Sequence, residues 1–381
     1  MILGWIFGAI PMAIWIYLLL GRSFFWLARE RDDRDELYTE LEAWPSVAAI
    51  VPARNEADVL DRSLGSLLQQ IYPGRFRIVL VDDQSSDGTS DAARAFGKTE
   101  RLDILSGTAR PIGWTGKTWA MSQGVARAST DAPDYYWFTD ADIAHSPDNL
   151  RRLVARAERD RFVLTSLMAK LNCTTIVEHG LIPAFVFFFA MLYPFGRVNN
   201  PRRRMAAAAG GCMLVRREAL EAAGGLSAIR QEIIDDCALA RRLKEQGPIW
   251  LGLTNRATSL RPYETLSDVR RMVSRSAYAQ LRYSRITLAA TMLGMAIVYV
   301  AAPFVAIFAW NSPQIAGWAT WLIMCLAYQP MLRFYRLSPF WGFALPLIGA
   351  IYAVFTLDSA VQFWRGRGGM WKGRAQAAGT A

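Results

Sequence analysis

The sequence has little cysteine, little histidine and little charge. Four cysteines and two histidines occur in 381 residues, without a C-x-x-C spacing, which excludes a disulfide scaffold and argues against a zinc site. Charged residues make up 20% of the chain and hydrophobic residues 52%, a composition that excludes a disordered protein. The absence of a G-x-G-x-x-G after the first predicted strand and of a P-loop disfavours a dinucleotide or Walker-type nucleotide site.

The basic residues of the chain are concentrated in a few stretches. Lys and Arg outnumber Asp and Glu by 43 to 33. Residues 197–217 hold six Arg and no acid, and residues 261–285 hold six Arg against Glu264 and Asp268. Because these stretches and residues 365–374 lie beside apolar segments, a bilayer surface is the expected anionic partner, and no nucleic acid is expected.

Long apolar runs lie at both ends of the chain. Residues 1–21 have no charged side chain and could cross a bilayer of about 30 Å, so residues 1–28 are expected to be a retained N-terminal anchor. A cleaved signal peptide is the alternative, but the basic start and small-residue cleavage site that it needs are missing. The C-terminal region, 286–364, predicts transmembrane segments near 286–309, 315–332 and 340–363, followed by a basic tail, 365–381.

The charges beside these runs give two indications of orientation. Arg22, Arg29, Arg31 and Arg34 favour a cytoplasmic middle region. The tail is also basic and favours the cytoplasm, although three C-terminal spans would place it outside. A re-entrant segment or a different division of the spans would resolve the conflict, and both alternatives stay open.

Residues 45–285 have the pattern of an α/β domain. Predicted strands alternate with predicted helices, which favours a mainly parallel sheet covered on both faces. Ser146-Pro147 is expected to cap and start a helix. Polar clusters follow three of the strands, where ligands bind in such sheets. The strands are expected at 47–51, 76–81, 102–105 and 135–139, and the clusters are 52–56, 82–87 and 140–142.

Two acidic pairs are the candidates for chemistry. Asp140-Ala141-Asp142 is a D-x-D at the end of an aromatic strand, where two carboxylates could hold a divalent cation that binds diphosphate oxygens. A second D-x-D, Asp33-Arg34-Asp35, is expected to be solvated. Asp235-Asp236 precede a helical pattern and could supply a general base. For both candidate pairs, stabilisation of a helix N-terminus is the alternative.

An uncharged aromatic segment interrupts the middle region. Residues 181–196 are expected to be a membrane-interfacial segment or a buried core helix, because about 15 residues are too few to span comfortably. Arginines at 197 and 202–204 follow it and could bind anionic headgroups.

The motifs of residues 45–285, taken in order, resemble those of family 2 glycosyltransferases with the GT-A fold, a Rossmann-like fold of nucleotide-diphospho-sugar transferases. The hopanoid-associated branch is the more similar, through Pro111–Lys117, the arrangement of spans and Trp371-Lys372-Gly373-Arg374, and the ceramide glucosyltransferases are more distant. The matching motifs are Ile50–Glu56, Val81–Thr89, Gly116-Lys117 with Ala120, Asp140–Asp142, Gly210–Cys212 with Gly224-Gly225, and Asp235-Asp236 with Leu239, Arg242-Leu243 and Gly247.

The resemblance implies an inverting hexosyl transfer (class EC 2.4) from a nucleotide sugar, most often UDP-linked, to a membrane lipid such as a hopanoid. It also implies an integral protein of a bacterial-type inner membrane, with the catalytic domain facing the cytoplasm. Asp236 would be the base beside Asp235, Asp140 and Asp142 would hold Mg2+ or Mn2+, and Gly210, Gly211 and Tyr283 would lie on the acceptor side. The nucleotide sugar would be bound by Pro52, Ala53, Arg54, Asn55, Glu56, Asp82, Asp83, Lys117, Asp140 and Arg282.

One departure from the family pattern bears on the alternatives. Many members carry Q-x-x-R-W, and the nearest match here is Ala279-Gln280-Leu281-Arg282-Tyr283. Since processive polysaccharide synthases depend on that motif and on more spans, a processive synthase subunit is the weaker alternative. The complete acidic set of Asp83, Asp140, Asp142 and Asp236 argues against the other alternative, a catalytically silent scaffold with the GT-A fold.

Overall fold

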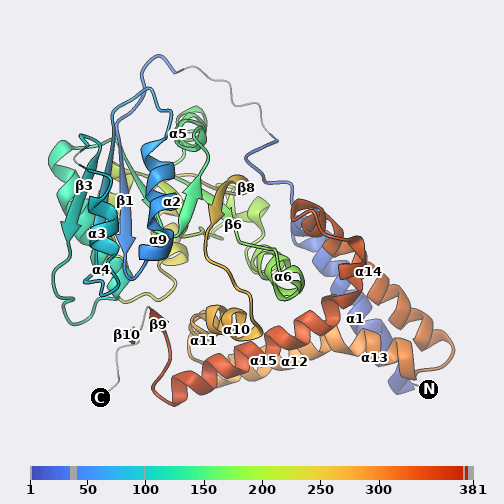
Figure 1. Cartoon of the computed structure of the whole chain (residues 1–381). Helices are drawn as coiled ribbons and strands as arrows, with labels where there is room; N and C mark the ends of the chain where they lie inside the picture. Colours follow the sequence, from blue (N-terminus) through green and yellow to red (C-terminus); the bar gives the residue numbers. More distant parts are fainter. Residues whose placement is uncertain (1, 35–40, 98, 372–373, 376–381) are drawn as a thin grey trace. The chain divides into compact units, whose positions relative to one another are not determined.

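The computed structural model describes residues 2–34, 41–97, 99–371 and 374–375. Its contacts divide the chain into two compact units, and each is described by itself (Figure 1). The sheet unit comprises Glu30–Asn172, Arg197–Pro262 and Met370–Ala381, and the helical unit comprises Met1–Arg29, Cys173–Gly196 and Tyr263–Gly369. This division differs from the expected domain of residues 45–285, because 173–196 and 263–285 pack with the apolar helices.

The sheet unit is built on an eight-stranded mixed sheet. Its order is β3-β2-β1-β4-β7-β6-β8-β5, in which β3, β2, β1 and β4 are parallel neighbours and β7 runs antiparallel to both β4 and β6. A separate hairpin is formed by β9 and β10. The strands are β1 (Val47–Ala53), β2 (Phe76–Asp82), β3 (Leu102–Ser106), β4 (Tyr135–Thr139), β5 (Ile143–His145), β6 (Leu164–Lys170), β7 (Cys212–Arg216), β8 (Ile249–Ser259), β9 (Met370–Trp371) and β10 (Arg374–Ala375).

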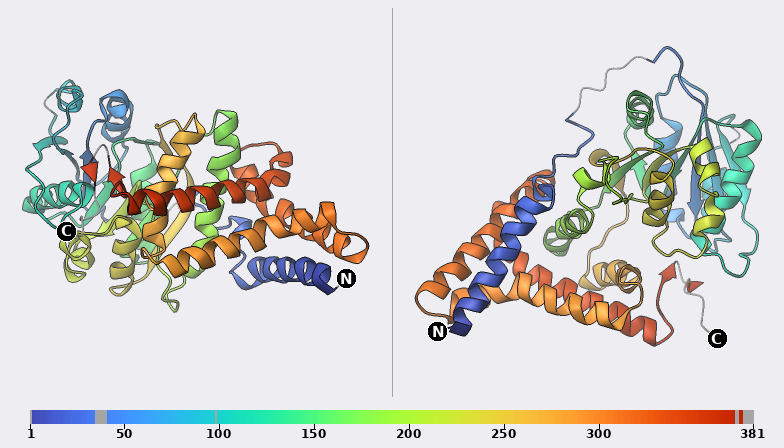
Figure 2. Two further views of the ribbon diagram at one scale, coloured as in Figure 1. Left: turned by 90° about the horizontal axis from the view of Figure 1, so that it is seen from below. Right: turned by 180° about the vertical axis from the view of Figure 1, so that it is seen from behind.

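Helices connect and cover these strands, as Figure 1 and the two further views of Figure 2 show. The strand β1 is buried along its whole length, as expected of a parallel strand covered on both faces. On one face, α4 lies so close that a Cβ on Gly124 would stand 2.6 Å from the Ile50 side chain. The helices are α2 (Ala57–Leu68), α3 (Thr89–Arg94), α4 (Gly116–Ala128), η2 (Ser129–Asp131), α5 (Asn149–Arg159), α8 (Arg217–Ala222), η3 (Leu226–Ile229) and α9 (Asp235–Lys244).

The four predicted strands are present within two residues of their predicted ends. The predicted start of the helix after the D-x-D is wrong. Helix α5 begins at Asn149 with Asp148 as its N-cap residue, and Ser146 instead accepts a backbone hydrogen bond from Asn149 (3.0 Å). The Ser-Pro pair therefore belongs to the turn before the helix.

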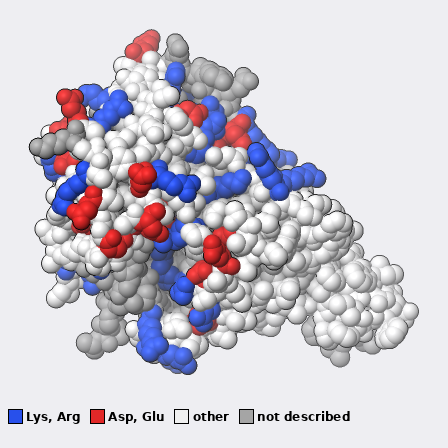
Figure 3. Space-filling view, in the orientation of Figure 1, with Lys and Arg blue, Asp and Glu red and all other residues white. Residues whose placement is uncertain are grey.

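The helical unit contains the long apolar helices of the chain. Four stretches are long and apolar enough to cross a membrane, namely Ile176–Val198, Arg285–Phe308, Ser312–Phe334 and Pro339–Trp364, and Gly8–Gly21 is a shorter apolar helix. Figure 3 shows a wide surface without charged side chains over these helices. The elements are α1 (Ile2–Gly21), η1 (Phe25–Leu27), α6 (Ile176–Leu192), α7 (Phe195–Val198, which crosses the boundary between the units), α10 (Leu266–Ser274), α11 (Ala277–Gln280), α12 (Arg285–Met295), η4 (Ala296–Val300), α13 (Ala301–Phe308), α14 (Ser312–Phe334), η5 (Pro339–Ala344) and α15 (Leu345–Trp364).

The aromatic segment of the middle region is longer than its uncharged run. A capping box of Thr175 and Glu178 starts α6 five residues before Leu181, and with α7 the helical stretch reaches 23 residues. The argument that this segment is too short to span a membrane is therefore wrong, because the helix includes polar residues at its start. By length and composition it is one of the four candidate spans.

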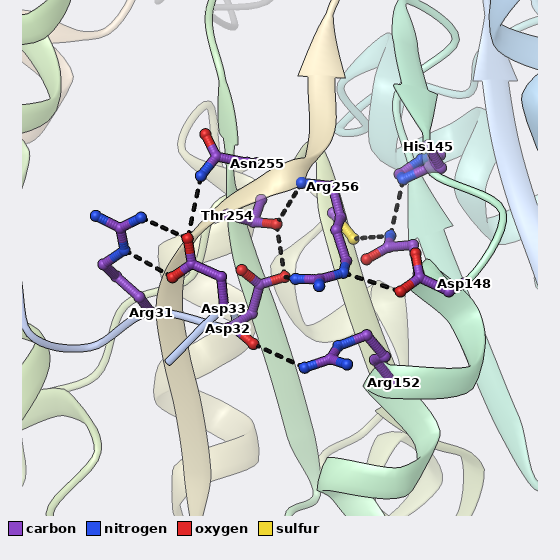
Figure 4. A network of polar contacts seen from close by, with 11 residues as sticks. Arg31, Asp32, Asp33, His145, Asp148, Arg152, Thr254, Asn255 and Arg256 are labelled. Carbon is purple, nitrogen blue, oxygen red and sulfur yellow. Dashed lines mark hydrogen bonds and ion pairs between the residues drawn. The ribbon is translucent and has the colours of Figure 1, made fainter. Parts of the chain in front are cut away.

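A buried polar network ties the segment after η1 to β8 (Figure 4). Asp32 is buried and accepts hydrogen bonds from Thr254 Oγ1 (2.7 Å) and Arg256 Nη1 (3.2 Å), while Arg256 Nε also pairs with Asp148 (3.1 Å). Asp33 accepts from Arg31 and Asn255, so the expectation that Asp33 is merely solvated is wrong; Asp35 lies outside the described residues. Burial raises the pKa of Asp32, partly offset by Thr254 and Arg256.

We expect Asp32→Ala to lower the midpoint of thermal unfolding. The variant leaves Thr254 and one Arg256 donor without their acceptor, which costs about 1–3 kcal/mol for buried groups. In a domain of this size, each kcal/mol of lost stability lowers the unfolding midpoint by about 2–4 °C. The matched control is Asp33→Ala, whose side chain is 27% exposed and whose ion pair with Arg31 is expected to contribute about 1 kcal/mol or less. Equal midpoints for the two variants would show that the buried network does not stabilise the sheet unit.

Candidate functional site

The three polar clusters lie side by side at one edge of the sheet. They follow β1, β2 and β4, and β1 lies between the other two strands in the sheet. Ala53 pairs with Asp82 at the ends of β1 and β2, and Ile50 pairs with Phe138 near the end of β4. The parallel strands therefore bring segments separated by up to 90 residues of sequence to a common edge, as the α/β pattern predicts.

Hydrogen bonds and an ion pair connect the ends of β1 and β2. Asp83 N donates to Ala53 O (2.8 Å), and the Arg54 guanidinium donates to Gln84 O (3.1 Å) and lies 3.7 Å from Asp83 Oδ2. The Asp83 side chain has no exposed surface. Asn55 and Gln84 have left-handed backbones, with φ of 51° and 55°, which few non-glycine residues adopt outside constrained sites.

Hydrogen bonds complete this part of the edge. Asn55 Oδ1 accepts from Ser86 N (2.9 Å), Asp82 Oδ1 accepts from Ser85 N (3.0 Å), and Glu56 N donates to Thr89 Oγ1 (2.9 Å). The conformation of the predicted nucleotide-binding loops is thus set by contacts between the two clusters.

Each carboxylate of the D-x-D is paired with a cation of the chain. Asp140 Oδ1 lies 2.7 Å from Lys117 Nζ at the start of α4, and Asp142 Oδ2 lies 3.0 Å from Arg261 Nε. Arg261 also forms an ion pair with Glu56. Arg261 was missed by the sequence analysis because it follows β8, far from every motif; its place in an arginine-rich stretch was the one available signal.

The start of α9 brings the second acidic pair to Lys117. Asp235 Oδ2 is 3.5 Å from Lys117 Nζ, and Asp236 accepts backbone hydrogen bonds from Gly210 N (2.9 Å) and Cys237 N (2.6 Å). A Cβ on Gly210 would stand 3.1 Å from Lys117 Nζ and 3.4 Å from Asp236 Oδ2. Glycine at position 210 therefore allows the backbone to approach the acidic pair.

The pKa values of Asp236 and Lys117 are both raised in this cluster. Burial, and then the neighbouring charge of Asp235, raise the pKa of Asp236 to about 6, against the opposing effect of Lys117. Although its burial acts in the other direction, the carboxylates of Asp140, Asp235 and Asp236 together raise the pKa of Lys117 above its usual value. Lys117 thus stays charged at neutral pH, while Asp236 ionises close to neutral pH.

Asp140 and Asp142 remain the predicted ligands of a divalent cation. Within the described residues, no group of three or more His, Cys, Asp or Glu side chains is arranged so that it could hold a metal ion. The protein can therefore supply two carboxylates, and the remaining oxygens must come from water and from a bound diphosphate. This is the usual coordination of Mg2+ in phosphate-binding sites.

His145 lies between the D-x-D and α5 in sequence, yet its contacts are those of a core residue. It is buried, hydrogen-bonds to Thr139 Oγ1 (2.8 Å) and Asn149 (3.0 Å), and packs its ring against Trp137. Burial lowers the pKa of His145 to about 3, so the ring is neutral and fixes the end of β4 beside Asp140.

Two predicted site residues belong to the helical unit. Arg282 and Tyr283 both have left-handed backbones, with φ of 53° and 56°, and the Tyr283 ring stacks on Phe363 at 4.4 Å. Tyr278 Oη donates to Tyr283 O (2.7 Å). These contacts define a constrained turn, and the binding roles of the two residues remain predictions, as does that of Gly211 in the sheet unit.

Comparison with known proteins relates this site to sugar transfer. The model of the family described as "Glycosyl transferase family 2" matches residues 48–224, and that of "Glycosyl transferase family group 2" matches residues 139–355, more than half of the chain. The chain is 35% identical over 98 residues to the 4,4'-diaponeurosporenoate glycosyltransferase of Staphylococcus aureus strain USA300, a match covering 26% of this chain and 24% of that protein. It thus spans about a quarter of the length of this relative.

A solved structure shares the fold of most of the chain. The mannosyltransferase PcManGT from Pyrobaculum calidifontis, solved with GDP-Man and Mn2+, superposes with a TM-score of 0.53 at 19% identity, over 91% of this chain and 99% of that one. At this identity the likeness concerns the fold alone. The fold is the GT-A arrangement that the sequence predicts. The two family models establish that the chain is a glycosyltransferase belonging to family 2.

Proposed function

We propose that the protein is a membrane-bound inverting glycosyltransferase that moves a sugar from a UDP-linked donor to a membrane lipid. The observation that carries the proposal is the convergence of Asp140, Asp235 and Asp236 around Lys117 at the sheet edge. A carboxylate with a raised pKa beside a D-x-D favours an active site over a scaffold without activity.

Asp236 is the proposed base. Its carboxylate accepts the proton of the acceptor hydroxyl while that oxygen attacks the anomeric carbon, and the bond from this carbon to the nucleoside diphosphate breaks on the opposite face. One step therefore forms the new glycosidic bond with inversion and releases the diphosphate. The Gly210 and Cys237 N–H groups hold the carboxylate in a fixed orientation for this transfer.

The remaining residues act on the donor. A divalent cation held by Asp140 and Asp142 would neutralise the charge that develops on the leaving diphosphate. Lys117 holds the carboxylates of Asp140 and Asp235 in place through ion pairs, and Arg54, Asp83 and the loop of Pro52–Glu56 form the proposed wall of the nucleotide pocket. Asp82 orients the second loop through Ser85.

The acceptor is proposed to be an isoprenoid-derived lipid. Four helices that could span a membrane support an acceptor that resides in the bilayer. The resemblance to the hopanoid-associated branch supports a hopanoid, and the S. aureus relative, named for a carotenoid acid, supports that class as the second candidate. We further propose a bacterial inner-membrane protein whose sheet unit faces the cytoplasm, where nucleotide sugars are made.

The test is release of UDP by the full-length protein in bilayer nanodiscs supplied with UDP-sugars and either a hydroxylated hopanoid or 4,4'-diaponeurosporenoate. We expect UDP release with one acceptor, loss of that release on adding EDTA, and a product heavier by one hexose in mass spectrometry. Release without any lipid product, or none with any UDP- or GDP-sugar and lipid extract, would contradict the proposed function.

A further inference from the structure

Arg261 is shared between two acidic clusters of the site. Its Nε lies 3.0 Å from Asp142 Oδ2, and its Nη2 pairs with Glu56 Oε2. The backbone before it is fixed to the D-x-D, since Leu260 N donates to Asp142 O (2.8 Å). The arginine thus comes from the end of β8, whereas its partners follow β1 and β4.

The geometry of the guanidinium distinguishes Arg261 from Lys117. The Nε and Nη2 groups form the edge of an arginine that can hold one carboxylate or one phosphate through two parallel hydrogen bonds. Here the two groups of this edge donate to different carboxylates, Nε to Asp142 and Nη2 to Glu56. Two oxygens of a diphosphate could accept from Nε and Nη2 together.

Arg261 and a divalent cation compete for Asp142. Within the described part of the chain, Arg261 is the hydrogen-bond partner of the Asp142 carboxylate, and its side chain is 30% exposed, which leaves it accessible to a ligand. A cation that binds Asp142 must either displace the guanidinium or bind close to it, where the two positive charges repel each other. Either route weakens metal binding for as long as Arg261 remains on Asp142.

We propose that Arg261 couples metal binding to donor binding. This inference rests on the proposed nucleotide-sugar donor. In the donor-free protein Arg261 occupies Asp142 and keeps its affinity for a divalent cation low. The diphosphate of the donor draws the guanidinium away from Asp142, and the released carboxylate then binds the cation. Linkage requires the converse, so that the cation raises the affinity for the nucleotide by the same factor.

The experiment measures Mn2+ affinity directly. Free Mn2+ is counted by electron paramagnetic resonance during titration of the full-length protein, without nucleotide, with UDP and, in a separate arm, with GDP. For the unsubstituted protein we expect weak binding that one nucleotide strengthens. For Arg261→Met we expect the affinity for Mn2+ without nucleotide to rise by at least about fivefold. The factor by which nucleotide increases the Mn2+ affinity should fall by at least about fivefold as well, because fivefold is the low end of typical coupling between two ligands.

Two controls separate this role from a structural one. Arg261→Lys keeps the charge but lacks the bidentate edge, and we expect its donor-free Mn2+ affinity to stay near that of the unsubstituted protein. Arg94→Met removes an arginine whose ion pair with Asp91 is exposed, and should leave Mn2+ binding unchanged. If Arg261→Met does not fold, Arg261→Gln replaces it.

The outcomes distinguish the inference from the function beneath it. Nucleotide-dependent Mn2+ binding that is the same in Arg261→Met as in the unsubstituted protein overturns the coupling and leaves the proposed function intact. Weaker donor-free Mn2+ binding in Arg261→Met overturns it as well, because it would mean that the arginine supports the metal site. Absence of Mn2+ binding with either nucleotide overturns both proposals.

Discussion

Asp236→Asn is expected to lower the turnover number by about 10²–10⁴-fold, the usual contribution of a general base. Asparagine has nearly the same shape, but its amide cannot accept the proton of an acceptor hydroxyl. UDP binding should remain within about twofold of the unsubstituted protein, because no proposed contact to the nucleotide involves Asp236. Turnover of sugar transfer and UDP affinity, measured separately, check the two parts, and an undiminished turnover would rule out Asp236 as the base.

The pH dependence of the activity is a second test of Asp236 as the base. Since burial and Asp235 raise the pKa of Asp236 to about 6, the active carboxylate is lost as the pH falls through about 6. Activity should therefore rise between about pH 5 and pH 7 and then level off. In Asp235→Asn, where the neighbouring negative charge is gone, the acidic limb should move to lower pH.

Lys117→Met is expected to lower kcat/KM by at least about 10²-fold. The loss of one electrostatic contact at a reacting centre typically has an effect of this size. The variant removes the cation that faces Asp140, Asp235 and Asp236 and leaves their charges to repel one another. Because Lys117 is the largest of the influences that oppose the rise in the pKa of Asp236, the acidic limb of the pH profile should move to higher pH. Its shift is thus opposite in direction to that of Asp235→Asn.

The matched control is Lys244→Met at the other end of α9. Lys244 donates to Asn200 O (3.0 Å) and also contacts Val198 O, so its loss should affect stability and leave the acidic limb in place. Equal pH profiles for Lys117→Met and the unsubstituted protein would show that Lys117 acts on the donor alone and does not tune the base.

The parallel half of the sheet and the positions of its polar clusters could be predicted because their signals are local. Each strand there is a short apolar run that ends in a polar cluster, and adjacent parallel strands must bring their clusters to one edge. Asp83, Asp140 and Asp142 were found in this way. The D-x-D at 140–142 and the one at 33–35 look alike in sequence, and the strand before the first is what distinguished them.

The parts that escaped prediction depend on contacts between distant segments. Nothing near Arg261 in the sequence indicates that β8 ends beside Asp142, because that pairing is set by the antiparallel half of the sheet. The burial of Asp32 likewise follows from Thr254 and Arg256, more than 200 residues away. The start of α6 was misplaced because a polar capping box precedes its apolar run.

The position of α6 within the chain also has a consequence for biosynthesis. The strands β7 and β8 follow α6 in sequence, yet β4 pairs with β7 and β6 pairs with β8. A nascent chain that has emerged only as far as β6 cannot complete the sheet, and the next segment to leave the ribosome is a 23-residue apolar helix. Domains usually fold as units in the order of their synthesis. Here the sheet cannot close until this helix has been made, so the order of translation places the synthesis of a candidate membrane span between the two halves of the sheet.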